Sequence, residues 1–305
     1  MNLKWDDLKL FLAVHEQGSL SAAARQLKLG QPTLSRRIAE LEADIGEALF
    51  ERQSQGTRLT ATGQKLLPAA QRMAEWASEA ELSVRKHARQ PHGKVRIAAP
   101  PGIAYSIVAP LAATLRRQHP GIQIEVLSGI ELLNLSRGEA DLALRTMKPN
   151  DADLICVDEI TSAMRVYVSK DYAATLPANP KLADLDWICW APPYEQLDVN
   201  RELAALIPGF KPAFTSDDYN VQFAACLSGV GAMVLPHLQQ RYNDRGASQH
   251  LQELDIDLGP AAQGTLYLVS HKRHRHLPKV GLAIDCISAE FARLRNDAVK
   301  PQAER

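Results

Sequence analysis

The residues with the clearest chemistry lie in the stretch "GQPTLSRRIAELE", which runs from Gly30 to Glu42. It brings an amide, two hydroxyls and two adjacent guanidinium groups close to one proline. Guanidinium groups can pair bidentately with guanine, and hydroxyls reach phosphates or base edges. The stretch therefore predicts a surface that binds an anion. The alternative is a helix face that is only exposed to solvent. The residues concerned are Gln31, Pro32, Thr33, Ser35, Arg36 and Arg37.

The local distribution of charged residues supports an anion-binding surface. The whole chain has 305 residues, and its 35 basic and 35 acidic side chains cancel, so a nucleic-acid surface must be a patch. Between residues 18 and 39 there is no acidic residue. The basic residues of that interval are Arg25, Lys28, Arg36 and Arg37.

Three helices are needed to hold this patch. The first is predicted to begin at Asp6 as N-cap and to end at Gly18, and the second to be capped by Ser19 or Ser21. In the third, Pro32 suits the first helical position. Apolar residues at steps of four, three and four predict its buried face, and Pro32 and Arg36 point away from that face. The apolar residues are Leu34, Ile38, Leu41 and Ile45.

A basic hairpin should follow these helices. "FERQSQGTRLT" predicts two short strands around a turn at residues 54–56, with Arg52 and Arg58 on its arms. Two helices joined by a tight turn present the second helix to the major groove of DNA, and a basic hairpin beside it can lie along the phosphates as a wing.

The order of these motifs resembles one family. The segment "LKLFLAVHEQGSLSAAARQLKLGQPTLSRRIAELEADIGEALFERQSQGTRLTATG" is similar to LysR-type transcriptional regulators, which share its helix pair, Gln-Pro, Ser-Arg, Leu-Glu, Leu-Phe-x-Arg and Leu-Thr-x-x-Gly. The resemblance implies double-stranded DNA with a quasi-palindromic promoter site as partner. One departure is Gly30, where the family usually has serine. The predicted DNA contacts are Ser21, Gln31, Pro32, Thr33, Ser35, Arg36, Arg37, Arg52 and Arg58.

A long helix is expected next, over residues 60–89. Its apolar residues alternate in steps of four and three and predict a narrow dimer seam, although Pro68 should kink the helix and an ordinary packed helix remains an alternative. A dimer would present two recognition helices to DNA, and the resemblance implies a homo-oligomer, a dimer or a tetramer. The seam residues are Leu66, Met73, Ala77, Ala80 and Val84.

The second half alternates strands and helices after a Pro/Gly break at residues 89–94, which predicts parallel sheet. Helices are expected at residues 103–118, 131–137, 220–228 and 278–295. The resemblance continues in "GEADLALR" and "GVGAMVLP" and implies two α/β subdomains that clasp a cleft, as in periplasmic binding proteins. The expected fold is a multi-domain α+β chain. Its parts are a winged helix-turn-helix at 1–60, a linker and dimerisation helix at 61–90, and an effector-binding domain at 91–305.

The resemblance also locates an effector cleft for a small molecule of unknown identity. Gly102 and Ile130 stand where the family usually has hydroxyl residues, so fewer hydroxyl anchors are expected. Arg145 could pair with a carboxylate and Trp190 could stack on a ring, unless they are structural residues. The predicted cleft residues are Pro101, Gly102, Ser128, Ile130, Arg145, Trp190, Thr215 and Ser216.

Other functions have weaker support. No catalytic constellation is recognisable, "GVG" falls short of a dinucleotide fingerprint, and "HKRHRH" at 271–276 is better explained as a solvated loop than as a metal site. We therefore expect neither enzyme activity nor a cofactor or metal. The four cysteines are widely spaced and are predicted to be buried free thiols, with a redox sensor as the alternative. Without a long apolar run or a signal peptide, the chain is predicted to be cytoplasmic, with no membrane partner.

Two alternatives to an effector-controlled regulator stay open. One keeps DNA binding but makes the C-terminal domain a ligand-free interaction module, which a cleft filled with apolar side chains would favour. The other is a solute-binding or enzymatic α/β protein whose N-terminal helices only oligomerise it.

Overall fold

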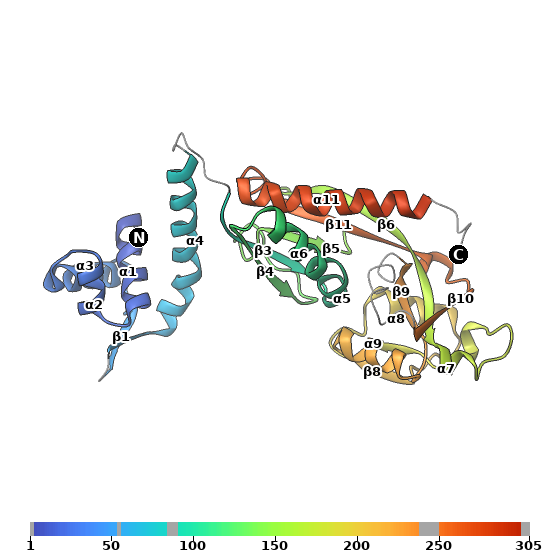
Figure 1. Cartoon of the computed structure of the whole chain (residues 1–305). Coiled ribbons are helices and arrows are strands. Elements are labelled where there is room, and N and C mark those ends of the chain that lie inside the picture. The colour runs from blue at the N-terminus through green and yellow to red at the C-terminus, as the bar shows by residue number, and fades with distance from the viewer. Residues whose placement is uncertain (1–2, 54–55, 84–90, 238–249, 300–305) are drawn as a thin grey trace. The chain divides into compact units, whose positions relative to one another are not determined.

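The computed structural model describes residues 3–53, 56–83, 91–237 and 250–299. The chain divides into two compact units, Met1–Arg89 and Gln90–Arg305 (Figure 1). The finer division at residues 60 and 90 stays a prediction, since the long helix belongs to the same unit as the N-terminal helices.

The N-terminal unit consists of three helices, a hairpin and a long helix. Leu34, Ile38 and Leu41 are buried, which confirms the predicted inner face of the third helix. They pack with Phe11 and Val14 of the first helix in one apolar core. The elements are α1 (Trp5–Gln17), α2 (Leu20–Gln26), α3 (Gln31–Ile45), β1 (Phe50–Gln53), β2 (Gly56–Leu59) and α4 (Ala61–Ser83).

The helix starts differ in detail from the predictions. Lys4 precedes α1 as its N-cap, so the assignment of Asp6 was wrong; Asp6 lies in the first turn, where a carboxylate favours the positive end of the helix dipole. Ser19 caps α2 by accepting a hydrogen bond from the Ala22 N–H at 3.2 Å. Pro32 is the second residue of α3, because α3 begins at Gln31.

The long helix α4 packs its first half on the N-terminal core. Ala70 is fully buried there and Leu66 is partly buried, whereas Met73 and Ala80 are exposed and Ala77 is half-buried. The helix continues through Pro68. Of the predicted seam, Leu66 therefore contacts its own subunit, and Val84 lies outside the described residues.

The first lobe of the C-terminal unit contains a mixed sheet. β3 (Gly93–Ala99) pairs in parallel with β4 (Ile122–Ser128) and β5 (Leu142–Arg145), as predicted. β11 (Gln263–His271) runs antiparallel to β5 and to β6 (Leu154–Ser169), so the expectation of parallel sheet was wrong for these strands. The chain returns from the second lobe before it forms β11, so β11 runs in the opposite direction to β3, β4 and β5.

Helices cover this sheet. A continuous helical stretch contains α5 (Pro101–Ile103), η1 (Ala104–Val108) and α6 (Ala109–Gln118), and α11 (Pro278–Val299) packs beside it along β6, as Figure 1 shows. Together they bury the main core of the lobe.

The predicted helix at residues 131–137 does not form, although all of these residues are described. The Asn134 N–H donates to the Glu139 carboxylate at 2.6 Å, and the Arg137 N–H donates to the Asn134 side chain at 3.0 Å. Side chains thus take the backbone donors that a helix would use, a competition typical of Asn and acidic residues.

The second lobe is built around the far half of β6, which pairs antiparallel with β9 (Met233–Pro236) and β10 (Leu251–Leu254). It has apolar cores of its own, which supports the prediction of two subdomains. Since β6 belongs to both lobes, it ties them together. The other elements are α7 (Lys170–Ala173), η2 (Leu182–Asp184), β7 (Ile188–Trp190), α8 (Asp198–Leu206), β8 (Phe214–Ser216), α9 (Tyr219–Leu227) and η4 (Gly259–Ala262).

The four cysteines are free thiols. Burial raises the pKa of Cys189 and of Cys226 to about 12, while Cys156 and Cys286 are half-buried. We expect Cys189 and Cys226 to resist alkylation by iodoacetamide at pH 8 in the folded protein and to react rapidly in denaturant, because only the thiolate attacks. Peptide mass spectrometry of the alkylated protein measures this, and rapid labelling of either residue without denaturant would contradict it.

Two broader features bear on function. Within the described part of the chain, no group of three or more His, Cys, Asp or Glu side chains could hold a metal ion. None of the described helices combines the length and the apolar character needed to cross a membrane.

Candidate functional sites: the recognition helix and the pocket

The outer face of α3 carries most of the predicted DNA contacts. Gln31, Pro32, Thr33 and Arg36 are exposed along its first two turns, and Ser35 is half-buried between them. Ser21 is exposed on α2. These polar groups thus cluster on one surface, and the N-terminus of α3 at this surface also favours anions.

The two adjacent arginines have different environments. Arg36 lies 3.5 Å from Glu40 of the next turn, with side chains 75% and 65% exposed, so this pair is weak. Arg37 forms an ion pair with Asp7 of α1, and its side chain is only 34% exposed. Arg36 is therefore available to a partner, whereas Arg37 ties α3 to α1.

The hairpin β1–β2 forms the predicted wing. Arg52 pairs in register with Thr57 and Glu51 with Arg58, whose side chain is exposed. The turn residues Ser54 and Gln55 lie outside the described residues.

The wing is anchored to the turn between α1 and α2. The Thr57 N–H donates to the Gly18 carbonyl at 2.8 Å. Gly56 has φ +145°, and a Cβ at this position would lie 2.3 Å from the same carbonyl oxygen. Only glycine allows this approach, so the wing keeps a fixed place beside the helices.

Glu42 connects α3 to the wing. Its carboxylate accepts hydrogen bonds from the N–H groups of Leu49 at 2.7 Å and Phe50 at 3.1 Å. Leu49 is fully buried. One carboxylate thus satisfies two donors where β1 begins.

The motif "LTATG" fixes the start of α4. The Thr60 hydroxyl accepts from the Gly63 N–H at 3.1 Å and donates to the Ala48 carbonyl at 2.7 Å. A Cβ on Gly63 would lie 2.3 Å from the Leu49 carbonyl oxygen. The small residue lets α4 pack directly on the segment that leads into β1.

Gly30 is the N-cap of α3 and has an extended conformation, with φ −68° and ψ 136°. A Cβ there would make ordinary contact, 3.6 Å from the Thr33 hydroxyl. We expect Gly30→Ser to stabilise the protein by a few tenths of a kcal/mol through capping. We also expect tighter operator binding, by about 0.5–1.5 kcal/mol if the hydroxyl reaches a phosphate. Thermal unfolding and DNA titration measure the two effects. Gly30→Ala is the control, and equal affinity of the Ser and Ala variants would exclude the phosphate contact.

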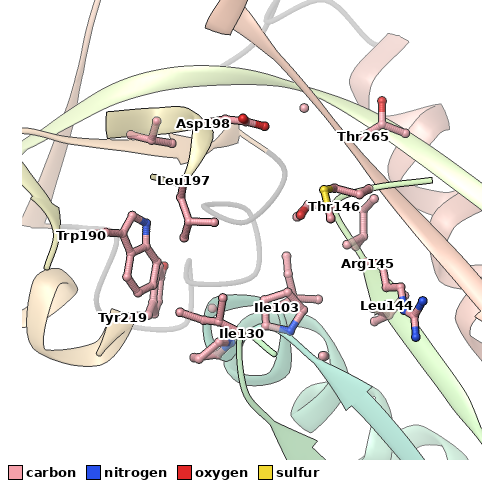
Figure 2. A pocket seen from close by; sticks show the side chains of 18 of the residues that line it. Ile103, Ile130, Leu144, Arg145, Thr146, Trp190, Leu197, Asp198, Tyr219 and Thr265 are labelled. Atoms are coloured by element: carbon pink, nitrogen blue, oxygen red, sulfur yellow. The ribbon is translucent and has the colours of Figure 1, made fainter. Parts of the chain in front are cut away.

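A pocket of about 780 Å³ lies between the two lobes of the C-terminal unit. In Figure 2, Trp190 and Tyr219 form one wall, Leu144, Arg145 and Thr146 lie across from them, and Ile103 and Ile130 stand between. Because both lobes and the connecting strands supply the lining, a ligand here would contact both subdomains.

The sequence-predicted cleft residues divide into two groups. Pro101, Gly102, Ile130, Arg145 and Trp190 line the pocket. Of the described residues, Ser128, Thr215 and Ser216 lie outside its lining, and the Ser216 hydroxyl accepts from the Asp218 N–H at 3.1 Å instead. Several lining residues had no sequence signal, because the fold brings them together from distant segments: Leu144, Leu197, Asp198, Tyr219 and Thr265.

Arg145 is held by its own lobe. It is 8% exposed, and its Nη2 donates to the Leu133 carbonyl at 2.7 Å, while its Nε has no hydrogen-bond partner among the described residues. Burial lowers the pKa of the Arg145 guanidinium, and the Asp151 carboxylate opposes that shift. The Arg145 side chain is thus held by its own lobe and is less free to bind a ligand carboxylate than an arginine without such a contact.

Comparison with known proteins matches both units. Residues 5–64 match the family described as "Bacterial regulatory helix-turn-helix protein, lysR family", and residues 88–292 match "LysR substrate binding domain". The crystal structure of full-length CbnR in complex with its target DNA is similar to this chain, with a TM-score of 0.59 and 20% sequence identity. The match covers 94% of this chain and 99% of CbnR, which shows a shared fold.

Two curated relatives extend the match. An HTH-type transcriptional regulator of Xanthomonas campestris pv. campestris is 35% identical over 167 residues, which are 55% of this chain and about half, 48%, of that relative. The HTH-type transcriptional regulator CrgA of Neisseria meningitidis serogroup B is 28% identical over 240 residues, 77% of this chain and 80% of the relative. Since the two family matches follow one another along nearly the whole chain, the protein belongs to the LysR-type family of DNA-binding transcriptional regulators.

Proposed function

We propose that the chain binds a quasi-palindromic double-stranded DNA site through α3 and the wing. Arg36 is the main reader of a base edge, assisted by Gln31, Thr33 and Ser35, because these side chains share the exposed face of α3. Pro32 contributes apolar contact. Ser21 and Arg58 contact phosphates, which position the protein without reading sequence. The same role is proposed for Arg52 from its sequence position alone, because its side chain lies outside the described ones.

Arg37 has a different role in this proposal from the one its sequence position suggests. Its ion pair with Asp7 supports a structural contribution, and any contact with DNA would have to break that pair. The exposed surface of Arg36 is the observation that carries the assignment.

The pocket is the effector site of the proposed regulator. An open cavity of about 780 Å³ favours an effector over a ligand-free interaction domain, which would fill the cleft with side chains. A molecule that binds the closed arrangement of the lobes more tightly than the open one shifts the population towards closure. The protein acts in the cytoplasm, where its DNA is, and has no catalytic role.

Dimers form through the outer face of α4, where Met73 and Ala80 are exposed and Ala77 is half-buried. We expect Ala80→Glu to weaken the dimer by about 100-fold or more, because an uncompensated buried charge costs about 3–5 kcal/mol. Sedimentation equilibrium measures the dissociation constant. Ala61→Glu, at the exposed first residue of α4, is the control. If the Ala80 variant dimerises like the control, this face of α4 is not the interface.

The experiment that tests the DNA proposal is selection of binding sites from a random DNA pool, followed by titration of the selected site against salt. A specific site should be bound at least about 10³-fold more tightly than shuffled DNA. The logarithm of the affinity should fall linearly with the logarithm of salt concentration, in proportion to the phosphates contacted. Failure to enrich any sequence would exclude the proposed function.

A further inference from the structure

We propose that the effector of this pocket is an uncharged, largely apolar molecule that carries an aromatic ring, and not an organic acid. This inference rests on the proposed function, because it assigns a ligand class to the effector site. Its support comes from the charges, the aromatic wall and the exposed apolar residues of the pocket lining.

The charged side chains of the lining are unfavourable for an anion. Three carboxylates and two guanidinium groups line the cavity, which leaves one formal negative charge. Arg201 already pairs with Asp198 at the start of α8. Arg145 is anchored to the Leu133 carbonyl through Nη2, and its buried Nε, which has no partner among the described residues, can donate to a neutral acceptor as well as to an acid. The remaining carboxylates, Glu131 and Glu202, would repel an incoming acid.

The rest of the lining is mainly apolar. Ile103 and Ile130 face the space in Figure 2, Leu144 also lines it, and Met164 and Val234 contribute from the second lobe. The Thr265 hydroxyl lies 3.0 Å from the Thr161 hydroxyl and so is already hydrogen-bonded. A ligand that lies against these groups gains most by burying apolar surface.

Trp190 and Tyr219 form a preorganised aromatic wall. The Asn200 side chain accepts from the Trp190 N–H at 3.0 Å and donates to its carbonyl at 2.9 Å, which fixes the Trp190 backbone. The Tyr219 ring stacks on Phe223 with centroids 5.9 Å apart and 12° between planes. Both rings pack in the same cluster. Fixed rings at one wall suit a ligand ring that stacks or meets them edge-on.

Two of the lining residues are both apolar and exposed. Leu132 and Met147 line the pocket and are 56% and 59% exposed. Exposed apolar side chains that continue a cavity mark a binding surface, and the flexible Met147 adapts to ligands of different shape. The pocket is therefore suited to a molecule larger than a simple acid.

Titration calorimetry of the full-length protein with methyl 2-naphthoate and with 2-naphthoate tests the proposal, because the two probes share a ring system and differ in charge. We expect the ester to bind at least about tenfold more tightly than the acid, a difference of about 1.4 kcal/mol. Trp190→Ala should weaken the ester about five- to tenfold, consistent with the value of an aromatic pair. Thr215→Ala, outside the lining, should leave its affinity unchanged.

The outcomes separate the ligand class from the effector site itself. Tighter binding of the acid that Trp190→Ala weakens would overturn the ligand class and keep the pocket as a ligand site. Binding of the ester that is unchanged in the Trp190 variant would place it elsewhere and overturn the proposal. Absence of binding by both probes would overturn the ligand class and count against the effector site.

Discussion

Glu42→Ala is expected to lower the free energy of unfolding of the N-terminal unit by about 2–4 kcal/mol, since a buried donor left unsatisfied costs about 1–3 kcal/mol and one of the two donors, at Phe50, is only half-buried. The donors are the N–H groups of Leu49 and Phe50, which the Glu42 carboxylate accepts together. Chemical denaturation followed by circular dichroism measures the change. Loss of operator affinity should accompany it, because the wing begins at Phe50.

Glu42→Gln is the matched control. Its amide oxygen can still accept from both N–H groups, but a neutral acceptor forms bonds about half as strong, so the loss should be only about 1 kcal/mol. Equal destabilisation by Ala and Gln would indicate that charge, and not the presence of an acceptor, is what matters. A stable Ala variant would show that water replaces the carboxylate.

Arg36→Ala is expected to weaken binding to the selected operator by about 1–3 kcal/mol, the value of a bidentate contact to guanine. Its stability should hardly change, since the pair with Glu40 is exposed. Arg37→Ala should do the reverse and lower stability by about 1 kcal/mol through loss of the partly buried pair with Asp7. Fluorescence anisotropy with operator and with shuffled DNA separates specific from general affinity.

Asp7→Ala completes this comparison. If Arg37 acts through its ion pair, Asp7→Ala and Arg37→Ala should not be additive in a double-mutant cycle. Additive losses would contradict the structural assignment, and a larger loss of operator affinity for Arg37→Ala than for Arg36→Ala would make Arg37 a DNA contact.

Local features were predictable from sequence because their causes lie within a few residues. The apolar spacing of Leu34, Ile38 and Leu41 determines the inner face of α3, since helix geometry places residues three and four apart on one side. The hairpin also follows from local sequence. The Asp6 N-cap was wrong by two positions, which is common where several residues can begin a helix.

Two other predictions were wrong, one because of side-chain to backbone hydrogen bonds within the segment and one because of long-range strand pairing. Residues 131–137 have helical composition, but Glu139 and Asn134 take their backbone donors. The direction of β11 could not be predicted from the local sequence either, because the residues it pairs with in β5 and β6 lie a hundred or more positions earlier in the chain.

The sequence by itself determined the family, the order of the domains and the exposed polar face of α3, because each depends on a pattern contained in one short segment. Only the tertiary structure decided that Arg37 pairs with Asp7, thirty residues away, while its neighbour Arg36 faces outward. It also decided which residues line the pocket, bringing Trp190 and Tyr219 of one lobe opposite Leu144 and Arg145 of the other. Such sites depend on side chains from segments that meet only after folding, and no local periodicity encodes those meetings.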